Sequence, residues 1–243
     1  FGIEVDMSVN KEHIQPFVEQ FEAFERQLNG ETKKPVHLLR KQAVDVLERV
    51  GFPTVKNEEW RYTPLSSLLS ARYVSPAQDA ASNGSFPVEH KATYPVSAEF
   101  LFVNGYSTES KIHADFVKDG VIVCTLAEAF EKHASLVQEH LGKYLNLDDD
   151  GFVALNTSFL HDGVFVYVPK GVRIVDPIHV AFHTSHEAGP AVTHPRILVV
   201  AERESSIKLV ESHTGRNEEA YFTNSVIEVN AGDGAHVEHY RIQ

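Results

Sequence analysis

The chain has little cysteine, methionine and tryptophan, with one residue of each among 243. Cys124 has no second thiol with which to form an internal disulfide, which is typical of a reducing compartment. One thiol also excludes zinc or iron–sulfur sites built from several cysteines of this chain. Because Cys124 lies in the apolar run 121–126, we expect a buried small hydrophobic residue. A reactive thiolate, which needs exposure and nearby positive charge, is the alternative.

Positive charge and long apolar runs are also scarce. Lys and Arg number 22 against 34 Asp and Glu, which gives a formal net charge of −12. Negative charge repels phosphate backbones and anionic membrane surfaces, so we expect neither nucleic acid nor membrane as a partner. No stretch approaches the ~20 apolar residues of a membrane span, and the N-terminus lacks the basic region of a signal peptide. We therefore expect a cytoplasmic protein.

Two amphipathic helices are predicted in the N-terminal part of the chain. In residues 11–29, apolar side chains recur at steps of three and four, with charged residues between them. A second helix is predicted over 36–50, because Gly51 fits its C-cap and Pro53 prevents its continuation. We expect the two helices to form a helical subdomain.

The next segment combines a breaker-rich stretch with short elements. Residues 75–97 carry repeated Ser, Pro, Asn and Gly, and we interpret them as a linker or an irregular surface loop. Short strands are predicted at 99–103 and 121–124, followed by a helix over 126–141. Residues 1–150 are thus predicted to form a mostly helical region with two short strands.

From Gly163 onward, the pattern changes to short apolar strands without helical periodicity. These strands are predicted at 164–168, 178–182, 197–201, 207–210, 222–229 and 236–242. Such spacing fits a sandwich or barrel, and also a parallel β-helix that buries each turn of chain against the next. The strand pattern is unfinished at Gln243, which suits a solenoid, and we expect the chain to be part of a longer protein.

Fourteen histidines raise the possibility of a metal site. The densest group comprises His179, His183, His186 and His194. In a strand, His179 and His183 share a face but stand roughly 13 Å apart, too far for one zinc ion. His236 and His239 face opposite sides of a strand. We therefore expect solvent-facing sheet histidines and no metal site.

Two other clusters contain potentially reactive groups. Ser158, His161 and Asp162 supply a nucleophile, a base and an acid, but triad members normally come from separate elements. The acids of residues 148–151 lack the Glu at the twelfth position of a calcium loop, so a solvated turn is expected. No nucleophile elbow or Gly-rich phosphate loop is present. We expect no catalytic residue, and no enzyme in this chain.

The stretch 57–65, Asn-Glu-Glu-Trp-Arg-Tyr-Thr-Pro-Leu, holds the only tryptophan. Pro64 disfavours a helical residue before it, so a helix entering here stops or kinks. Arg61 stands between Trp60 and Tyr62, where a guanidinium can stack on a ring or grip a carboxylate. We interpret the stretch as a structural plug that closes a helical subdomain, with a ligand site as the alternative.

This stretch resembles the N-terminal signature of the SufB/SufD family, the scaffold proteins of the SUF iron–sulfur cluster assembly system. Residues 152–172 resemble the entry to that family's β-helix, and shorter matches follow in family order. These lie at 176–178, 194–196, 209–211, 222–224 and 235–243. The single cysteine and the Trp-Arg-Tyr-Thr-Pro sequence favour the SufD branch over the SufB branch, whose members carry additional cysteines.

The resemblance implies a mainly β fold, with an N-terminal helical (α+β) region before a right-handed parallel β-helix. Its first part would be residues 151–243, and the later turns and a C-terminal helical domain would lie outside this chain. It also implies a non-enzymatic scaffold that pairs with a SufB-like paralogue, or forms a homodimer, and binds a SufC-like ABC-type ATPase through the C-terminal domain. The nascent iron–sulfur cluster is expected in the complex, with no cofactor in this chain.

No catalytic, cofactor-binding or metal-binding residue of the family matches a position here. The residues that match the family pattern are interpreted as structural: Trp60, Arg61, Tyr62, Pro64, Asn156, Arg196 and Asn224. Asn156 and Asn224 are predicted to cap turns or stack in ladders, and Arg196 is predicted to pair with Glu211.

Two alternatives stay open. A β-helix enzyme acting on acidic polysaccharide would need clustered acids and bases on one face, and an export signal; neither is seen. A SufB-like subunit that accepts sulfur would use Cys124 as its acceptor.

Overall fold

A computed structural model describes residues 7–28, 34–76, 87, 90–113, 116, 119–185, 189–215 and 220–243. The chain divides into two compact units. The helical unit comprises Phe1–Val74 and Leu145–Leu160, and the sheet unit comprises Ser75–Tyr144 and His161–Gln243. Among the described residues, every helix is too short or too polar to span a bilayer.

The helical unit contains four α-helices and one 3₁₀ turn in its described part. They are α1 (Met7–Gln27), α2 (Pro35–Val50), η2 (Glu58–Trp60), α3 (Ser66–Leu69) and α7 (Gly151–Ser158). Both predicted N-terminal helices are confirmed, although the predicted stop of the first at 29–30 lies outside the described residues. Gly51 ends α2 at a φ of 70°, and its N–H donates to the carbonyl of Leu47.

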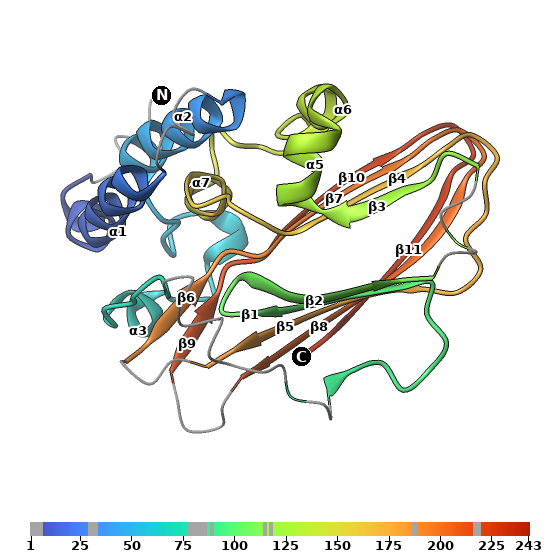
Figure 1. The fold of residues 1–243 in the computed structure, drawn as a ribbon. Helices are drawn as coiled ribbons and strands as arrows, with labels where there is room; N and C mark the ends of the chain where they lie inside the picture. Colours follow the sequence, from blue (N-terminus) through green and yellow to red (C-terminus); the bar gives the residue numbers. More distant parts are fainter. Residues whose placement is uncertain are drawn as a thin grey trace. The chain divides into compact units, whose positions relative to one another are not determined.

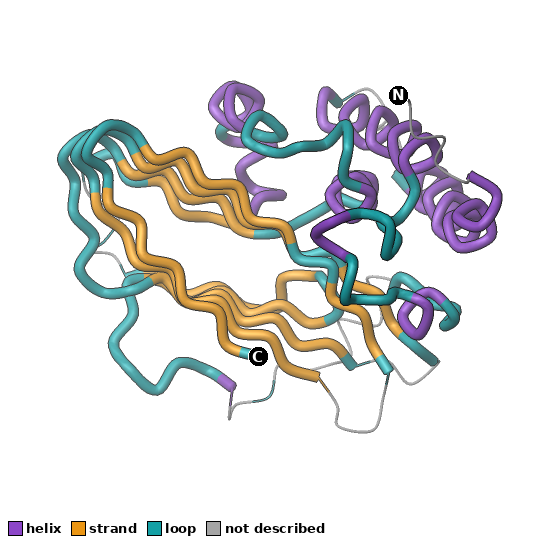
Figure 2. Tube along the Cα trace, turned by 180° about the vertical axis from the view of Figure 1, so that it is seen from behind, coloured by secondary structure: helices purple, strands orange, loops and turns teal. Residues whose placement is uncertain are grey.

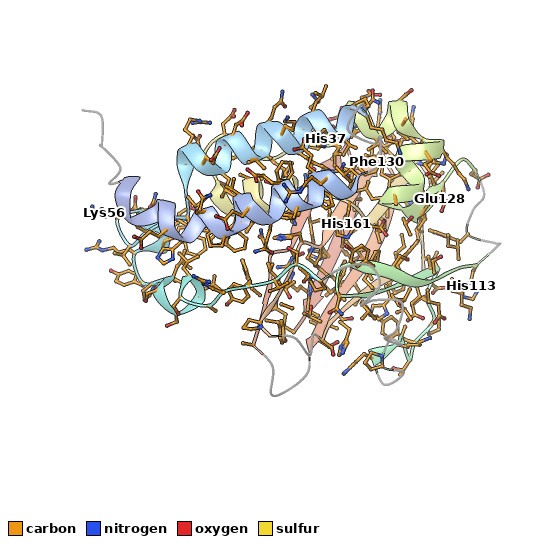
Figure 3. The ribbon with its side chains drawn as sticks, turned by 60° about the vertical axis from the view of Figure 1, so that its left-hand side comes forward. His37, Lys56, His113, Glu128, Phe130 and His161 are labelled. Carbon is orange, nitrogen blue, oxygen red and sulfur yellow. The ribbon has the colours of Figure 1, made fainter. Side chains whose placement is uncertain are left out.

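Aromatic side chains form much of the core of the helical unit. Phe52 packs against Phe17, with ring centroids 5.7 Å apart, and against Phe152 at 5.0 Å. Buried Arg40 of α2 lies over the ring of Phe24 at 5.5 Å and donates to the carbonyl of Leu160. His37, also buried on α2, lies 2.9 Å from Glu25 (Figure 3). These contacts fix α1 and α2 in the unit.

Helix α7 is a correction to the predicted β region, which was to begin at residue 151. The Asp150 carboxylate accepts hydrogen bonds from the N–H groups of Phe152 and Val153, which is the geometry of a helix N-cap. A Cβ on Gly151 would lie 1.9 Å from the carbonyl oxygen of Gly51. The glycine therefore permits α7 to approach the end of α2 closely, and the acidic turn 148–151 serves to start a helix.

The sheet unit is built from eleven strands and two short helices in its described part. The strands are β1 (Ala98–Val103), β2 (Tyr106–Ile112), β3 (Ile122–Thr125), β4 (Val164–Val168), β5 (Ile178–Thr184), β6 (Ala191–Thr193), β7 (Arg196–Ala201), β8 (Ser206–Gly215), β9 (Tyr221–Thr223), β10 (Val226–Ala231) and β11 (His236–Ile242). The helices are α5 (Leu126–Lys132) and α6 (Ala134–His140).

Each strand from β4 to β8 pairs in parallel with the strand three places later in the chain. The resulting sheets have the orders β11-β8-β5-β1-β2, β10-β7-β4-β3 and β6-β9. Successive turns of chain therefore stack on one another, and their strands run side by side in Figures 1 and 2. Among the described residues, only two pairs are antiparallel: β2 with β1, and β3 with β4. The structure is thus mixed α/β, with mostly parallel sheets and an N-terminal helical region.

The hydrophobic core of the sheet unit is formed by alternate residues of the two larger sheets. Phe100, Val166, Val180, Val199 and Leu209 are each at most 1% exposed. Full burial of such a side chain contributes about 1.5–3 kcal/mol. The surface of each sheet that faces away from this core is called its outer face below. Residues that directly precede or follow a core residue in a strand lie on the outer face.

Several predicted elements differ from the observed ones. Strands β2 and β6 were not predicted, and the predicted strand 222–229 is two strands, β9 and β10. The predicted helix 126–141 is divided at His133, whose φ of −130° is not helical. The N-terminal region accordingly contains three strands in its described part, where two were predicted.

The two units also divide the chain differently from the predicted boundary at residue 150. Strands β1 and β3 pair with β5 and β4, so the segment that carries them belongs to the sheet unit. Most of the predicted linker 75–97 lies outside the described residues. Its end, residues 90–97, is described and makes ordered contacts with β1 and β5.

Candidate functional site

In the signature stretch 57–65, Trp60 and Leu65 are partly buried and the other residues are exposed. The Trp60 ring packs on Phe152, with centroids 5.3 Å apart. The Arg61 guanidinium lies over the ring of Tyr62 at 5.6 Å, and Tyr62 is 87% exposed. Pro64 is exposed as well. Trp60 thus packs within the helical unit, and the structural roles of Trp60, Arg61, Tyr62 and Pro64 stay predictions.

The two asparagines of the family pattern are both buried. Asn156 lies on α7 and is fully buried, and Asn224 lies between β9 and β10. The Asn224 N–H donates to the carbonyl of Thr193, which links two successive turns of chain. Burial agrees with a structural role, whereas side-chain caps or ladders at these positions stay predictions.

Arg196 pairs with Glu228, not with Glu211 as predicted. Both side chains are fully buried, and the guanidinium donates to the Glu228 carboxylate. Arg196 precedes the core residue Ile197 and therefore lies on the outer face of its sheet. Glu211 follows Leu209 at a spacing of two, which places it on the core side of β8. The predicted partners thus lie on different sides of their sheets.

The Arg196–Glu228 pair lies within the sheet unit, where α6 meets β10. The second oxygen of Glu228 accepts a hydrogen bond of 2.7 Å from the Gly142 N–H, just after α6. Nearby, the Asn230 amide donates to the Tyr144 hydroxyl, 2.9 Å away. Burial lowers the pKa of Arg196, although Glu228 opposes the change. The pair therefore connects the helices to the sheet through a desolvated charge.

A second buried network is centred on Glu211 of β8, whose side chain is fully buried. Its carboxylate lies 2.6 Å from His213 Nε2 and 3.0 Å from His239 Nε2. Arg241 and Ser225 also donate to it. Burial alone would raise the pKa of Glu211, but the bonds and charges of His213 and Arg241 outweigh it and lower the pKa to about 2. A stable carboxylate is therefore held in the interior by a set of buried and half-buried polar side chains.

The prediction of solvent-facing sheet histidines is wrong for His179 and His194, which are 3% and 5% exposed. His179 lies between Glu99 and Ser212, at hydrogen-bonding distance from both. Burial lowers the pKa of His194 to about 3, with a further contribution from His161. His186 lies outside the described residues. Over the described part of the chain, no three His, Cys, Asp or Glu side chains are placed to hold a metal ion.

Ser158, His161 and Asp162 make three separate structural contacts. Ser158 donates to the carbonyl of Ala154 within α7. His161 Nε2 lies 3.0 Å from the Gly105 carbonyl (Figure 3), and Asp162 accepts from the N–H groups of Ala127 and Gly163. Burial raises the pKa of Asp162. None of these contacts joins two of the three side chains.

Cys124 is buried on β3, as predicted. Burial, followed by the charge of Glu128, raises the pKa of its thiol to about 12, although Lys132 opposes the change. The thiolate is the reactive form of cysteine, so this environment suppresses reaction with electrophiles.

We expect iodoacetamide to alkylate Cys124 in the native chain at least about tenfold more slowly than in urea, since each unit of pKa reduces the thiolate fraction tenfold. Mass spectrometry after timed quenching measures both rates. Free cysteine added to the same reaction is the control for reagent activity. Equal rates in native and unfolded protein would contradict the buried assignment and favour Cys124 as a sulfur acceptor.

Family models match nearly the whole described chain. The model for the SufBD protein N-terminal region matches residues 11–180, and that for the SufBD core domain of the SUF iron–sulfur assembly system matches residues 182–243. Iron-sulfur cluster assembly SufBD family protein slr0076 of Synechocystis is 30% identical over 220 residues. That match covers 84% of this chain and 46% of the relative.

Two Bacillus subtilis relatives match different shares of this chain. Iron-sulfur cluster assembly protein SufD is 27% identical over 240 residues, covering 95% of this chain and 51% of SufD. Iron-sulfur cluster assembly protein SufB is also 27% identical, over 70% of this chain and 39% of SufB. The chain thus spans about half or less of each relative's length. By these matches, the chain belongs to the SufB/SufD family, the iron–sulfur cluster assembly proteins of the SUF system.

Proposed function

We propose that this chain is part of a SufD-like scaffold subunit that supports iron–sulfur cluster assembly without catalysing a reaction by itself. The observation that carries the proposal is the family match over residues 11–180 and 182–243. The match to Bacillus SufD extends over 95% of the chain, against 70% for SufB, which favours the SufD branch. The protein would act in the cytoplasm.

We infer that the stacked sheets are the first turns of a right-handed parallel β-helix. In support, β4, β7 and β10 pair in order, as do β5, β8 and β11, while β6 pairs with β9. A coil of this kind presents open strand edges, and such edges are normally covered by a partner or a cap. A SufB-like paralogue would cover the coil in a heterodimer, and a second copy of the subunit would do so in a homodimer.

The remaining partner in this proposal is a SufC-like ABC-type ATPase. Since the chain spans about half the length of its relatives, the ATPase would bind a C-terminal domain in the other half. The nascent iron–sulfur cluster is cargo of the whole complex, and this chain needs no cofactor of its own. The raised pKa of Cys124 argues against the rival role of sulfur acceptor for that residue.

The test is co-purification of the full-length parent with SufB-like and SufC-like proteins from the same cell, followed by size-exclusion chromatography. We expect one mixed complex in which the SufC-like protein hydrolyses ATP. Moving the affinity tag to the SufB-like protein controls for retention caused by the tag. A homodimer that binds neither partner would overturn the scaffold proposal and return attention to an enzyme acting on polysaccharide.

A further inference from the structure

Three side chains from neighbouring strands meet on the outer face of the sheet β11-β8-β5-β1-β2. Glu99 of β1 pairs directly with His179 of β5. Ser212 of β8 pairs with Ala181, two residues beyond His179. Since diagonal neighbours in a sheet are within reach of long side chains, His179 can contact both residues at once. The core side chains beside them, such as Phe100 and Val180, point to the opposite face.

The contacts follow the order carboxylate, imidazole, hydroxyl. Glu99 Oε1 lies 3.1 Å from His179 Nδ1, and His179 Nε2 lies 3.0 Å from Ser212 Oγ. An ionised carboxylate can only accept a hydrogen bond, so the proton of neutral His179 resides on Nδ1. Nε2 is then an acceptor, and the Ser212 hydroxyl donates to it. This is the arrangement by which a serine nucleophile is activated.

The surroundings hold the base in place, and the residue that carries the hydroxyl is only partly buried. The Glu99 and His179 side chains are 12% and 4% exposed, whereas Ser212 is half-buried. The Ala92 N–H donates to Glu99 Oε1 at 2.7 Å, and the Tyr94 ring packs 5.9 Å from the His179 ring. The carboxylate and the imidazole are thus held in fixed positions, which a base that activates a nucleophile requires.

We propose that Ser212 is a nucleophilic serine, activated by His179 and Glu99, that accepts an acyl group from activated esters. Ser212 Oγ attacks the carbonyl carbon, and its proton passes to His179 Nε2. The bond from that carbon to the leaving group breaks, and the leaving group takes the proton from His179. The product is an acyl-serine and a free alcohol or thiol. One acyl group is accepted per chain, so the proposal is compatible with a non-enzymatic scaffold and independent of it.

The test uses p-nitrophenyl acetate and a fluorophosphonate probe on the 243-residue chain, with the labelled residue identified by tandem mass spectrometry. We expect one label per chain at Ser212 and none in Ser212→Ala. His179→Gln and Glu99→Gln should slow labelling by about 10²–10⁴-fold, the range for loss of a positioned base.

Ser225→Ala is the matched control, because Ser225 contacts the Glu211 carboxylate and Arg241 but no described histidine. Its labelling rate should equal that of the native chain. Melting temperatures of all variants separate a lost nucleophile from a lost fold, and only variants that melt within a few degrees of the native chain are compared. Absence of label in the native chain, or labelling of Ser212 that is unchanged in a folded His179→Gln variant, would overturn the proposal.

Discussion

Replacement of either partner of the Arg196–Glu228 pair is expected to lower the free energy of unfolding by about 3–5 kcal/mol. Both side chains are fully buried, so removal of one leaves an uncompensated charge without water. Glu228→Leu also removes the acceptor for the Gly142 N–H, and Arg196→Met leaves the Glu228 carboxylate without its cation. Urea titration followed by circular dichroism measures the change for each variant.

The double variant Arg196→Met/Glu228→Leu distinguishes a paired charge from two independent packing positions. Since replacing a whole buried ion pair by apolar residues is often neutral, we expect it to lose much less stability than the sum of the single changes. Glu128→Ala breaks the exposed Lys132–Glu128 pair and should cost less than about 1 kcal/mol. A double variant that loses as much stability as the two single variants together would contradict a direct Arg196–Glu228 pair.

The sequence predicts strands of two kinds well: β4, which is apolar on both faces, and β11, in which apolar and polar residues are mixed. The predicted strand 164–168 coincides with β4, and 236–242 coincides with β11. Strand β6 escapes prediction because Ala191–Thr193 is too short to show a period. A strand that is buried on both faces shows no alternation of apolar and polar residues. Apolar runs alone therefore do not distinguish a sandwich, a barrel and a stacked coil.

The sequence contains an N-cap signal for helix α7, which the prediction of a solvated turn at 148–151 does not use. Asp150 stands before an apolar run and is a good N-cap. The prediction of a solvated turn follows only from comparing the acids around Asp150 with a calcium loop, which they do not match. The helix is short and buried on several sides, so it lacks an amphipathic stripe. Its position against α2 rests on the approach of Gly151 to Gly51, a contact far apart in sequence. Such contacts are not evident from local periodicity.

The buried polar residues were partly predictable. Alternate residues of a strand share a face, so Glu211 and His213 lie on the core side of β8 with Ile207 and Leu209. Arg196 lies on the outer face of its sheet, and this alternation therefore excludes it as a partner of Glu211. The identity of the true partner, Glu228, depends on the pairing of β7 with β10. Residues 90–97, interpreted as linker or loop, pack beside buried His179: the Tyr94 ring lies against its ring, and the Ala92 N–H donates to its partner Glu99. No local pattern in β5 predicts these contacts.

Acidification should remove a large part of the stability contributed by Glu211. Its pKa is about 2 in the folded chain, against an ordinary value of 4.5, so its contribution is complete above pH 4.5 and disappears as the pH falls toward 2. A difference of this size corresponds to about 3 kcal/mol. In Glu211→Gln, we expect the free energy of unfolding near neutral pH to be lower by a similar amount, since Arg241 loses its anionic partner.

The distinguishing result is the slope of stability against pH. Between pH 5 and pH 2, the native chain should lose about 3 kcal/mol more than Glu211→Gln, because an amide at this position binds no proton in that range. Asp148→Asn, which changes a carboxylate whose side chain is 84% exposed, serves as the control and should retain the native slope. If the free energy of unfolding falls equally with pH in the native chain and in Glu211→Gln, then His213, Arg241 and Ser225 do not hold Glu211 as a carboxylate. The polar interior around β8 would then need another arrangement of its charges.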